Sequence, residues 1–427
     1  MKSDKNIREG YKKTAVGVIP VEWEVKPFNK CFKHLRAYTV SRNQLNYERN
    51  ESCIYNIHYG DIHSAFPNNI LDVKTDIELI PVIVNPEIDT PELLQDGDLI
   101  MADASEDYEG IGKTIELANV EDRKIVSGTH TFPLRPITEF APKYAGFIFS
   151  EFNIHKQIMK IATGISVYGI SKGNIPKVQL PIPPLPEQQA IANCLTTWDS
   201  GIEKLTQLIA AKREQKKGLM QQLLTGKKRL EGFVGEWKEV KLGDKFEYKN
   251  GKSYEKEITD NGKYNLITLN SIDITGELKN THHKVNINDN SLKKDDVIMI
   301  LSDVAHGYFL GLSALIPDNS YVLNQRVGGL RLKSNDNVIF IRMLINFNQR
   351  YFKRMGQGSS QQNLSKGDIL KFKFKLPSLE EQNAITTILT TADKEIALLE
   401  KKLEAMKEEK KGLMQVLLTG KKRLIDS

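Results

Sequence analysis

Two long stretches of the chain place apolar residues three and four positions apart, which is the spacing of an amphipathic helix. The first runs from Pro186 to Thr225 without an internal proline, and the second repeats it 194 residues later. Each ends at Thr-Gly-Lys-Lys-Arg, where glycine favours a helix end and the cations suit its negative pole. The apolar positions predicted to form one seam are Ile202, Leu205, Ile209, Leu219 and Leu223 in the first helix, and Ile396, Leu399, Leu403, Met406, Leu413 and Leu417 in the second.

The two predicted helices belong to a repeat. Residues 185–230 align without a gap with residues 379–424, at 27 identities in 46 positions. A lone helix of about 40 residues is roughly 60 Å long and would leave its apolar seam in water. The other copy is the partner of matching length, so we expect the two helices to pair in antiparallel fashion. That pairing would return the C-terminal end of the chain to its N-terminal part.

The sequence around the helices also repeats. Residues 170–175 resemble 364–369, residues 17–26 resemble 232–241, and proline-containing joints precede both helices. We therefore expect two related units in a pseudo-two-fold, effectively cyclic arrangement. The predicted segments are a globular domain over 1–183, a joint and long helix over 184–230, a second globular domain over 231–377 and a second long helix over 378–427.

The globular domains mix both kinds of secondary structure, which predicts an α+β fold. Runs rich in β-branched and other apolar residues predict strands, and two longer apolar stretches predict helices. The predicted strands include Leu79–Val84, Asp98–Met101, Tyr264–Leu269 and Val297–Leu301, and the predicted helices are Ala145–Ile161 and Val338–Met355.

Composition narrows the class of protein. The 427 residues are 40% hydrophobic, enough for several cores, and the three cysteines form no CxxC pair. The N-terminus has no apolar segment of a targeting signal, and no apolar run approaches the ~20 residues of a membrane span. A cytoplasmic protein is expected. The net charge of +6 fits a polyanion partner, but the first 185 residues are slightly acidic, so local patches would have to bind it.

The joint PPLPEQQAIA, the terminus LLTGKKRL, their recurrence late in the chain and the opening GVIPVEWEV together resemble the specificity subunit of a type I DNA restriction–modification system. The resemblance implies a non-catalytic subunit whose globular domains are target-recognition domains, each reading one half of a split sequence in double-stranded DNA. The helices would space the halves and dock two methyltransferase subunits, with restriction/translocase subunits joining for cleavage. It also implies that S-adenosylmethionine, ATP and Mg²⁺ act on other subunits, that this chain binds no cofactor, and that no membrane is involved.

Several polar segments have the chemistry of DNA contacts. Arginine can bond guanine bidentately, asparagine and glutamine can bond adenine, and lysine and hydroxyl groups bind phosphates or base edges. Two glycine-led loops at matching positions of the repeat, starting at Gly164 and Gly358, are expected to enter strands. The candidates are Arg36, Arg42, Asn43, Gln44, Asn46, Tyr47, Arg49, Ser166, Tyr168 and Lys172 in the first domain, and Lys249, Asn250, Lys252, Ser253, Tyr254, His306, Tyr308, Gln325, Arg326, Ser359, Ser360, Gln361, Gln362 and Lys366 in the second. Solvated surface loops remain the alternative interpretation of each segment.

Other sites are less well supported by the residues. Residues 103–114 lack the first glycine of a phosphate loop, because Asp107 stands there. Tyr55–Ile62 is predicted to be a strand and its end, on which His58 and His63 point to opposite faces, and this disfavours a metal site with Asp61. Asp273, Glu277 and Lys279, a weak nuclease-like pattern, lie in a predicted turn. Two rival functions stay open: a coiled-coil scaffold whose globular ends bind proteins, and an autonomous nuclease or methylase.

Overall fold

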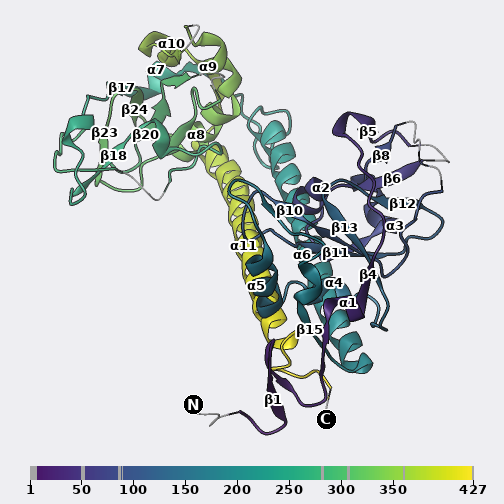
Figure 1. The fold of residues 1–427 in the computed structure, drawn as a ribbon. Coiled ribbons are helices and arrows are strands. Elements are labelled where there is room, and N and C mark those ends of the chain that lie inside the picture. The colour runs from purple at the N-terminus through teal and green to yellow at the C-terminus, as the bar shows by residue number, and fades with distance from the viewer. Residues whose placement is uncertain are drawn as a thin grey trace. The chain divides into compact units, whose positions relative to one another are not determined.

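The computed structural model describes residues 7–49, 53–84, 88, 90–279, 283–304, 308–358 and 361–425. The chain divides into two compact units (Figure 1). Unit 1 comprises Met1–Gln207 and Lys401–Ser427, and unit 2 comprises Leu208–Glu400. The two long helices, α6 (Leu185–Leu223) and α11 (Leu379–Leu417), each begin in one unit and end in the other. The two long helices predicted from the repeat are confirmed.

Unit 1 is built on a five-stranded central sheet. Its order is β4 (Phe32–His34), β13 (Thr131–Pro136), β9 (Leu99–Ala102), β11 (Thr114–Ala118) and β7 (Ile70–Asp72), and only the β11–β7 pair is parallel. A four-stranded sheet contains β12 (Lys124–Ser127), β6 (Ile54–Ile57), β8 (Val82–Ile83) and β5 (Leu45–Asn46). Three short ribbons pair β1 (Tyr11–Thr14) with β2 (Gly17–Pro20), β3 (Glu24–Pro27) with β15 (Gln179–Ile182), and β10 (Ala104–Ser105) with β14 (Tyr168–Gly169).

The helices of unit 1 other than α6 and α11 are short. They are α1 (Phe28–Cys31), α2 (Tyr59–Ser64), α3 (Val73–Asp76), α4 (Ala145–Ile148) and α5 (Phe152–Ile161), with 3₁₀ turns η1 (Arg42–Gln44), η2 (Ile77–Leu79) and η3 (Ile175–Lys177).

Unit 2 has a four-stranded central sheet with the order β17 (Phe246–Asn250), β24 (Val327–Leu332), β20 (Val297–Ile300) and β22 (Ser313–Leu315), all antiparallel. A second sheet contains β19 (His283–Val285), β18 (Tyr264–Ile267) and β23 (Tyr321–Leu323), and two ribbons pair β16 (Lys238–Lys241) with β26 (Lys373–Leu376) and β21 (Ser302–Val304) with β25 (Gln361–Asn363). The short helices are α7 (Leu242–Lys245), α8 (Val338–Phe347), α9 (Gln349–Met355) and α10 (Lys366–Leu370), with 3₁₀ turns η4 (Glu255–Glu257) and η5 (Leu269–Ser271).

The two central sheets follow one plan. Strands β4, β13, β9 and β11 of unit 1 occur in the same order as β17, β24, β20 and β22 of unit 2, and the pairing is antiparallel throughout both sets. Each sheet also carries one buried ion pair at the matching place. Arg135 lies 2.6 Å from Asp98 in unit 1, and Arg331 lies 2.5 Å from Asp296 in unit 2. The duplicated α+β fold predicted from the sequence is confirmed.

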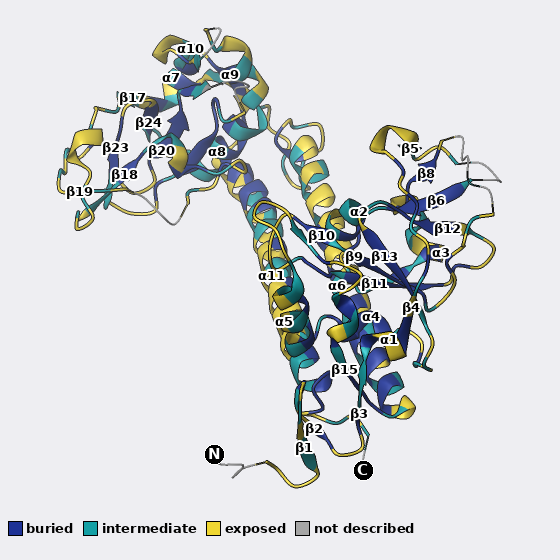
Figure 2. Ribbon diagram, in the orientation of Figure 1, coloured by how far each residue is buried: buried dark blue, intermediate teal, exposed yellow. Residues whose placement is uncertain are grey.

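Each unit packs one end of each long helix into its own core. In unit 1 the core around Trp23 and Tyr144 includes Leu195 of α6 and Leu417 of α11, all inaccessible to solvent. In unit 2 a corresponding core includes Leu223 of α6 and Leu389 of α11. Figure 2 shows that buried residues concentrate on the central strands and on the inward faces of the helices. Removing this apolar surface from water at roughly 25 cal/mol per Å² supplies the main stabilisation.

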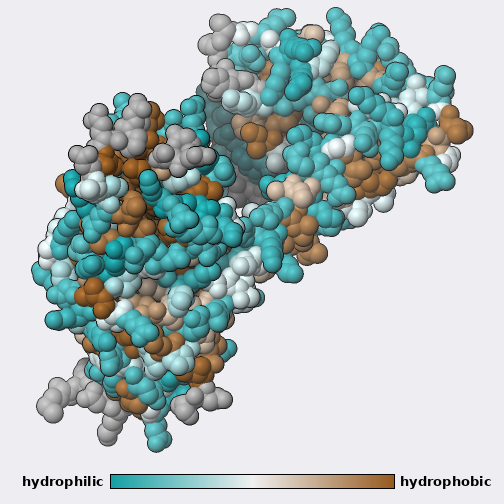
Figure 3. Space-filling model, turned by 90° about the vertical axis from the view of Figure 1, so that its right-hand side faces the viewer, coloured by the Kyte–Doolittle hydropathy of each residue, from teal (hydrophilic) through white to brown (hydrophobic). Residues whose placement is uncertain are grey.

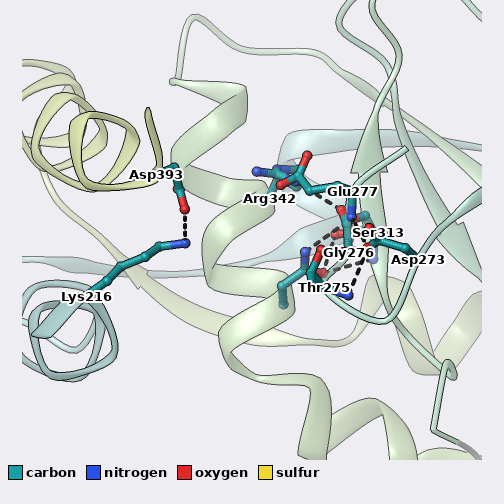
Figure 4. Close-up of polar contacts among 9 residues, drawn as sticks. Lys216, Asp273, Thr275, Gly276, Glu277, Ser313, Arg342 and Asp393 are labelled. Carbon is teal, nitrogen blue, oxygen red and sulfur yellow. Dashed lines mark hydrogen bonds and ion pairs between the residues drawn. The ribbon is translucent and has the colours of Figure 1, made fainter. Parts of the chain in front are cut away.

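The long helices pair antiparallel in both units. In unit 1, Glu187 at the start of α6 contacts Arg423, just beyond the end of α11, and Asp199 of α6 contacts Lys410 of α11. Residue numbers therefore rise along α6 where they fall along α11. Unit 2 shows the same direction, because Lys216 contacts Asp393 (Figure 4) and Arg229 contacts Glu381. The antiparallel pairing expected from the sequence is confirmed. All predicted seam residues are buried or half-buried: Ile202, Leu205, Ile209, Leu219, Leu223, Ile396, Leu399, Leu403, Met406, Leu413 and Leu417.

Four local predictions were wrong in part. Ala145–Ile161 is two helices, since the Glu151 carboxylate caps a new helix by accepting from Ile154 N–H. Val338–Met355 breaks at Asn348, whose side chain bonds the Leu344 carbonyl. Within Leu79–Val84 only Val82–Ile83 is a strand. Tyr55–Ile62 ends as a strand at Ile57, and His58 then caps α2, so the opposite-face argument for its histidines does not hold.

On the face shown in Figure 3 hydrophilic residues predominate, and hydrophobic residues form separate small patches. None of the helices in the described part of the chain combines the length and the apolar character needed to cross a membrane.

Candidate nucleic-acid interface

One end of each central sheet gathers several of the predicted DNA contacts. In unit 1, β9 ends where β13 and β11 begin, because the three strands are antiparallel. The residue after β9, Asp103, donates its N–H to the His130 carbonyl (3.1 Å) and accepts from Ile170 N–H (2.8 Å). Asp103 therefore joins the β12–β13 turn to the strand that follows the first glycine-led loop, and these backbone contacts of Asp103, His130 and Ile170 form a junction at this end of the sheet.

Unit 2 contains the same junction. Leu301 follows β20, donates to the Arg326 carbonyl (3.0 Å) and accepts from Leu364 N–H (2.8 Å). Leu364 lies 194 residues after Ile170, which is the offset of the sequence repeat. Two chemically unlike residues, Asp103 and Leu301, thus make the same backbone connections, so the junction is a property of the fold in both units.

A two-stranded ribbon rises from each junction. In unit 1 it pairs Ser105 with Tyr168, and in unit 2 it pairs Asp303 with Gln362. A β-ribbon fits the major groove of B-DNA, and glutamine can bond adenine there. The ribbon of unit 1 carries the predicted contact Tyr168, and the ribbon of unit 2 carries Gln361 and Gln362. All three side chains are half-buried.

The glycines that open the two loops are required by geometry. Gly164 has φ 141° and Gly358 has φ 119°, and a Cβ at either would lie 1.9 Å or 2.1 Å from a carbonyl oxygen of the same loop. No other residue fits there. The loops then enter β14 and β25, as predicted. In the first loop Ser166 is exposed beside Ile165, which is 94% exposed.

A lysine accompanies each ribbon. Lys172 Nζ lies 5.9 Å from the centre of the Phe132 ring, and Lys366 Nζ lies 5.7 Å from that of Tyr248, while both lysines remain exposed. The face of an aromatic ring attracts an ammonium group, so each ring holds its lysine in place while the charge remains accessible to solvent. The pair supplies positive charge at the same end of both central sheets.

In unit 1 the segment after β4 packs on the same turn. Tyr38 N–H donates to Ser127 O (2.8 Å), and Val40 N–H donates to the Thr129 hydroxyl (3.2 Å). Arg36 stacks on Tyr38 (4.9 Å), and Arg42 lies 3.1 Å from Asp61 while its side chain stays 65% exposed. The segment that carries Arg36 and Arg42 therefore packs on the β12–β13 turn.

The remaining candidates of that segment are partly engaged within the protein. The Ser41 hydroxyl bonds Asn43 and Gln44 (both 2.6 Å), and Asn46 accepts from Glu48 N–H (3.2 Å). Arg49 binds Glu78 (2.6 Å) and the Ile77 carbonyl (3.0 Å), and its side chain is only 24% exposed. Arg49 thus holds η2 in place. Tyr47 is 53% exposed.

In unit 2 the end of β17 reaches the same junction. Asn250 pairs with Gly328 at the start of β24, and Lys252 accepts from Gln325 N–H (2.8 Å). Lys249, Asn250 and Lys252 therefore lie near Arg326. Tyr254 bonds Asp289 (3.0 Å), and the Tyr308 ring lies under Lys353 (5.7 Å).

The carboxylate of Glu255 binds two of the candidate DNA contacts in unit 2 and would compete with DNA for them. Glu255 accepts from Ser253 (2.6 Å) and Gln325 (2.7 Å), and these hydrogen bonds hold the pKa of Glu255 at about 2. Glu255 is therefore ionised at neutral pH and repels phosphate, so Ser253 and Gln325 would have to exchange partners to bind DNA. His306, Ser359 and Ser360 lie outside the described residues.

In unit 1 histidines and aromatic rings surround the junction. His130 Nδ1 lies 3.3 Å from Asp103, and its ring meets the Tyr59 ring edge-on at 5.4 Å. Burial raises the pKa of Asp103, opposed by His130 and Lys172. Burial also lowers the pKa of His58. Neither His130 nor Tyr59 is among the residues predicted from the sequence to contact DNA, although His130 lies 196 residues before the candidate Arg326.

The alternative chemistries find no support in these contacts. No group of three or more histidine, cysteine and acidic side chains within the described ranges could hold a metal ion. Asp273 accepts from Thr275 and from Glu277 N–H, and Glu277 pairs with Arg342 (Figure 4), which is the geometry of a closed turn. Asp107 accepts from Gly110 N–H, so the glycine-containing segment 103–114 is likewise a folded turn.

The repeated motifs themselves build a buried clamp that sequence reasoning missed. In unit 2, Arg229 of the Gly-Lys-Lys-Arg motif donates twice to Glu381 (2.5 and 2.6 Å), and Trp237 Nε1 donates to the same carboxylate (3.2 Å). In unit 1, Arg423 and Trp23 bind Glu187 in the same way, Trp23 at 2.8 Å. The recurrence of all three motifs was the signal that could have predicted the contact.

Comparison with known proteins agrees with this architecture. The family described as type I restriction modification DNA specificity domain matches residues 92–213 and 235–408. A relative from Methanocaldococcus jannaschii, the putative type I restriction enzyme MjaX specificity subunit, is 26% identical over 451 residues and covers 97% of both chains.

Solved structures show the same fold at low sequence identity. The type I restriction–modification S subunit from M. genitalium is 17% identical, with a TM-score of 0.54, and the match covers 92% of this chain and 96% of that one. A chain from a structural study of type I R-M complex assembly is 16% identical, with a TM-score of 0.61 and coverage of 94% and 97%. With two family matches that together span most of its length, this chain belongs to the DNA specificity subunits of type I restriction–modification systems.

Proposed function

We propose that each unit reads one half of a bipartite duplex sequence, and that the chain itself catalyses no reaction. It acts with two methyltransferase subunits and with restriction/translocase subunits. S-adenosylmethionine, ATP and Mg²⁺ are used by those partners. The observation that carries the proposal is the repeated junction, because Asp103 and Leu301 place a turn, a ribbon and a lysine at the same end of both sheets.

The junction has the right chemistry for duplex DNA. It exposes cations and amides on a ribbon and on turns, which is what phosphate positioning and base reading require. The two units differ in the residues at matching positions, such as Tyr168 in unit 1 and Gln362 in unit 2. Unlike side chains on a common framework are what two different half-sites need.

Alanine variants of Arg42 and Lys366 test the proposal in the complex reconstituted with its methyltransferase. Each should weaken binding to the target duplex without weakening methyltransferase binding. Lys124→Ala and Lys294→Ala are matched controls, since both lysines are exposed at the opposite ends of their sheets. Failure of the wild-type complex to bind any duplex would instead favour a scaffold that binds proteins.

Two glycines support the docking of partners on the helices. Gly218 and its repeat partner Gly412 lie in helix interiors, and nothing lies within 4 Å of a Cβ built at either. A glycine there destabilises a helix by roughly 0.5–1 kcal/mol relative to alanine. A partner backbone that approaches closely would explain why both copies keep it.

This docking proposal is tested with Gly218→Ala and Gly412→Ala. Each variant should raise the thermal midpoint of the free chain while weakening its binding to the methyltransferase in a pull-down titration. Equal or tighter methyltransferase binding by both variants would remove this support. The purified chain alone, supplied with S-adenosylmethionine, ATP and Mg²⁺, should neither methylate nor cleave DNA.

A further inference from the structure

Both units hold a charged or ionisable residue in a backbone conformation that favours glycine. His130 has φ 55° and Arg326 has φ 68°, each at the turn before the central strand that follows it. An L-residue is strained in this left-handed region, and glycine would relieve the strain. Strained backbone that persists in a fold often marks a functional position.

The two residues occupy the same place in the two units. The His130 carbonyl accepts from Asp103, which follows β9, and the Arg326 carbonyl accepts from Leu301, which follows β20. Each residue therefore lies at the junction, next to the ribbon and within the end of the sheet where the candidate contacts gather.

Their side chains are available to a ligand. The His130 side chain is 59% exposed, and Arg326 is also exposed. In the described part of the chain, the Arg326 guanidinium makes no hydrogen bond or ion pair, so its donors face solvent. Glycine would adopt the backbone conformation of Arg326 with less strain, so the guanidinium is not needed for the fold.

We propose that His130 and Arg326 are matching DNA-contact residues, one in each half-site reader. This inference rests on the proposed function. Arg326 carries the fork of donors that binds guanine O6 and N7. His130 is oriented differently, because its Nδ1 faces Asp103 and its ring meets Tyr59, which leaves Nε2 to face a base edge or phosphate. Asp103 acts as a positioning residue for that imidazole.

Glycine variants separate a binding role from a structural one. His130→Gly and Arg326→Gly remove the side chain and also relieve the strain, so the thermal midpoint of the full chain should stay unchanged or rise. In the complex with the methyltransferase, each variant should weaken binding to the duplex methylated by the wild type, roughly tenfold or more. The loss should follow one half of the sequence for His130→Gly and the other half for Arg326→Gly.

The matched controls are Asn119→Gly and Asp295→Gly. Both residues also have positive φ, at 56° and 68°, but they lie after β11 and before β20, at the opposite ends of the sheets. These variants should leave DNA affinity unchanged. Arg326→Lys should restore charge but not guanine preference, and Asp103→Asn should weaken only the half-site lost in His130→Gly.

The inference is overturned if His130→Gly and Arg326→Gly bind the duplex as tightly as wild type, or if they lose stability and both half-sites together. It is also overturned if the controls lose as much affinity. A wild-type complex that binds no specific duplex would be a different result, since it would sink the proposed function itself.

Discussion

Glu187 and Glu381 show how one buried carboxylate can connect an arginine and a tryptophan from other parts of the chain. Glu381 is 1% exposed and binds the guanidinium of Arg229 and the indole of Trp237. A buried carboxylate keeps its negative charge at low cost only when that charge is paired and its oxygens are bonded. The glutamate of the joint, the arginine of Gly-Lys-Lys-Arg and the tryptophan recur in both copies and form the same contact in each.

Breaking the clamp should strongly destabilise unit 2. Glu381→Ala leaves Arg229 and Trp237 without their shared acceptor, so we expect the free energy of unfolding to fall by about 2–4 kcal/mol. Urea denaturation of the full chain measures this. The control is Glu380→Ala, one residue away and exposed, which should cost less than about 0.5 kcal/mol. Equal effects of both variants would contradict the role given to the clamp.

Glu116 predicts a pH dependence of unit 1. Burial raises the pKa of Glu116 to about 7, although Lys143 and Gly146 N–H groups donate to it. The unfolded chain releases this proton near pH 4.5, so the folded state alone binds it between the two values. Stability from this group is therefore full below about pH 4.5, falls as the pH rises to about 7, and is then constant.

Glu116→Gln removes that titration. The free energy of unfolding of the variant minus that of wild type should increase by up to about 3 kcal/mol as the pH rises from about 5 to about 8, because only the wild type loses stability over this range. Urea midpoints at a series of pH values measure the difference. Parallel pH profiles for the two proteins would show that Glu116 does not titrate as described.

At the scale of elements, the long helices were predictable and the short ones were not. The three-and-four spacing and the repeat identify α6 and α11 within two residues of their ends. The breaks at Glu151 and Asn348 come from side-chain capping of backbone groups, and the end of β6 comes from His58 capping α2. Capping depends on local geometry that apolar spacing does not encode.

Candidate contacts divide for a similar reason. Lys172 and Lys366 were found because they recur at the offset of the repeat, and the fold places both at a junction. Arg49 looks equally suitable in sequence, but it is held by Glu78 and Ile77. Composition can select residues that are able to bind DNA, whereas only tertiary contacts show which of them are already engaged.

The repeat supplies two Asp–Lys pairs on the helix seam for a comparison. Asp199 with Lys410 and Asp393 with Lys216 are related by the 194-residue offset. The side chains of the first pair are 11% and 12% exposed, whereas those of the second are 46% and 26% exposed. Burial raises the pKa of Asp199, and Lys410 opposes the rise.

Double-mutant cycles with alanine should give a larger coupling energy for the first pair. We expect about 2 kcal/mol for Asp199 and Lys410 and less than about 1 kcal/mol for Asp393 and Lys216, because water screens the exposed pair. Urea denaturation of the four variants in each cycle provides the numbers. A larger coupling in the exposed pair would contradict this order.

At the scale of the whole molecule, both ends of the chain take part in one clamp. The Tyr11 hydroxyl donates to the Gly420 carbonyl (2.7 Å), and Arg423 binds Glu22 (3.1 Å) as well as Glu187. In the corresponding clamp of unit 2, Arg229 and Trp237 lie on one continuous segment, and only Glu381 comes from a distant part of the chain. The cyclic arrangement expected from the repeat therefore has direct contacts in unit 1.

Circular permutation tests this arrangement. A chain opened within Glu231–Gly235, with its original ends joined by a short flexible linker leading to the region of Gly17, should fold and direct methylation to the wild-type sequence. The new ends fall in a connection between two repeated elements, where permutation is usually tolerated. A permutant opened inside α6 is the control, and it should fail. Failure of the first permutant alone to bind the methyltransferase would contradict the arrangement.

Mapping of methylated positions across the genome, in cells with and without this gene, tests the central claim most directly. The account predicts one bipartite sequence, with two specified halves separated by a fixed number of unspecified base pairs, whose methylation disappears when the gene is deleted. A single continuous motif, or methylation that is the same with and without the gene, would contradict the reading of DNA by two units of one chain.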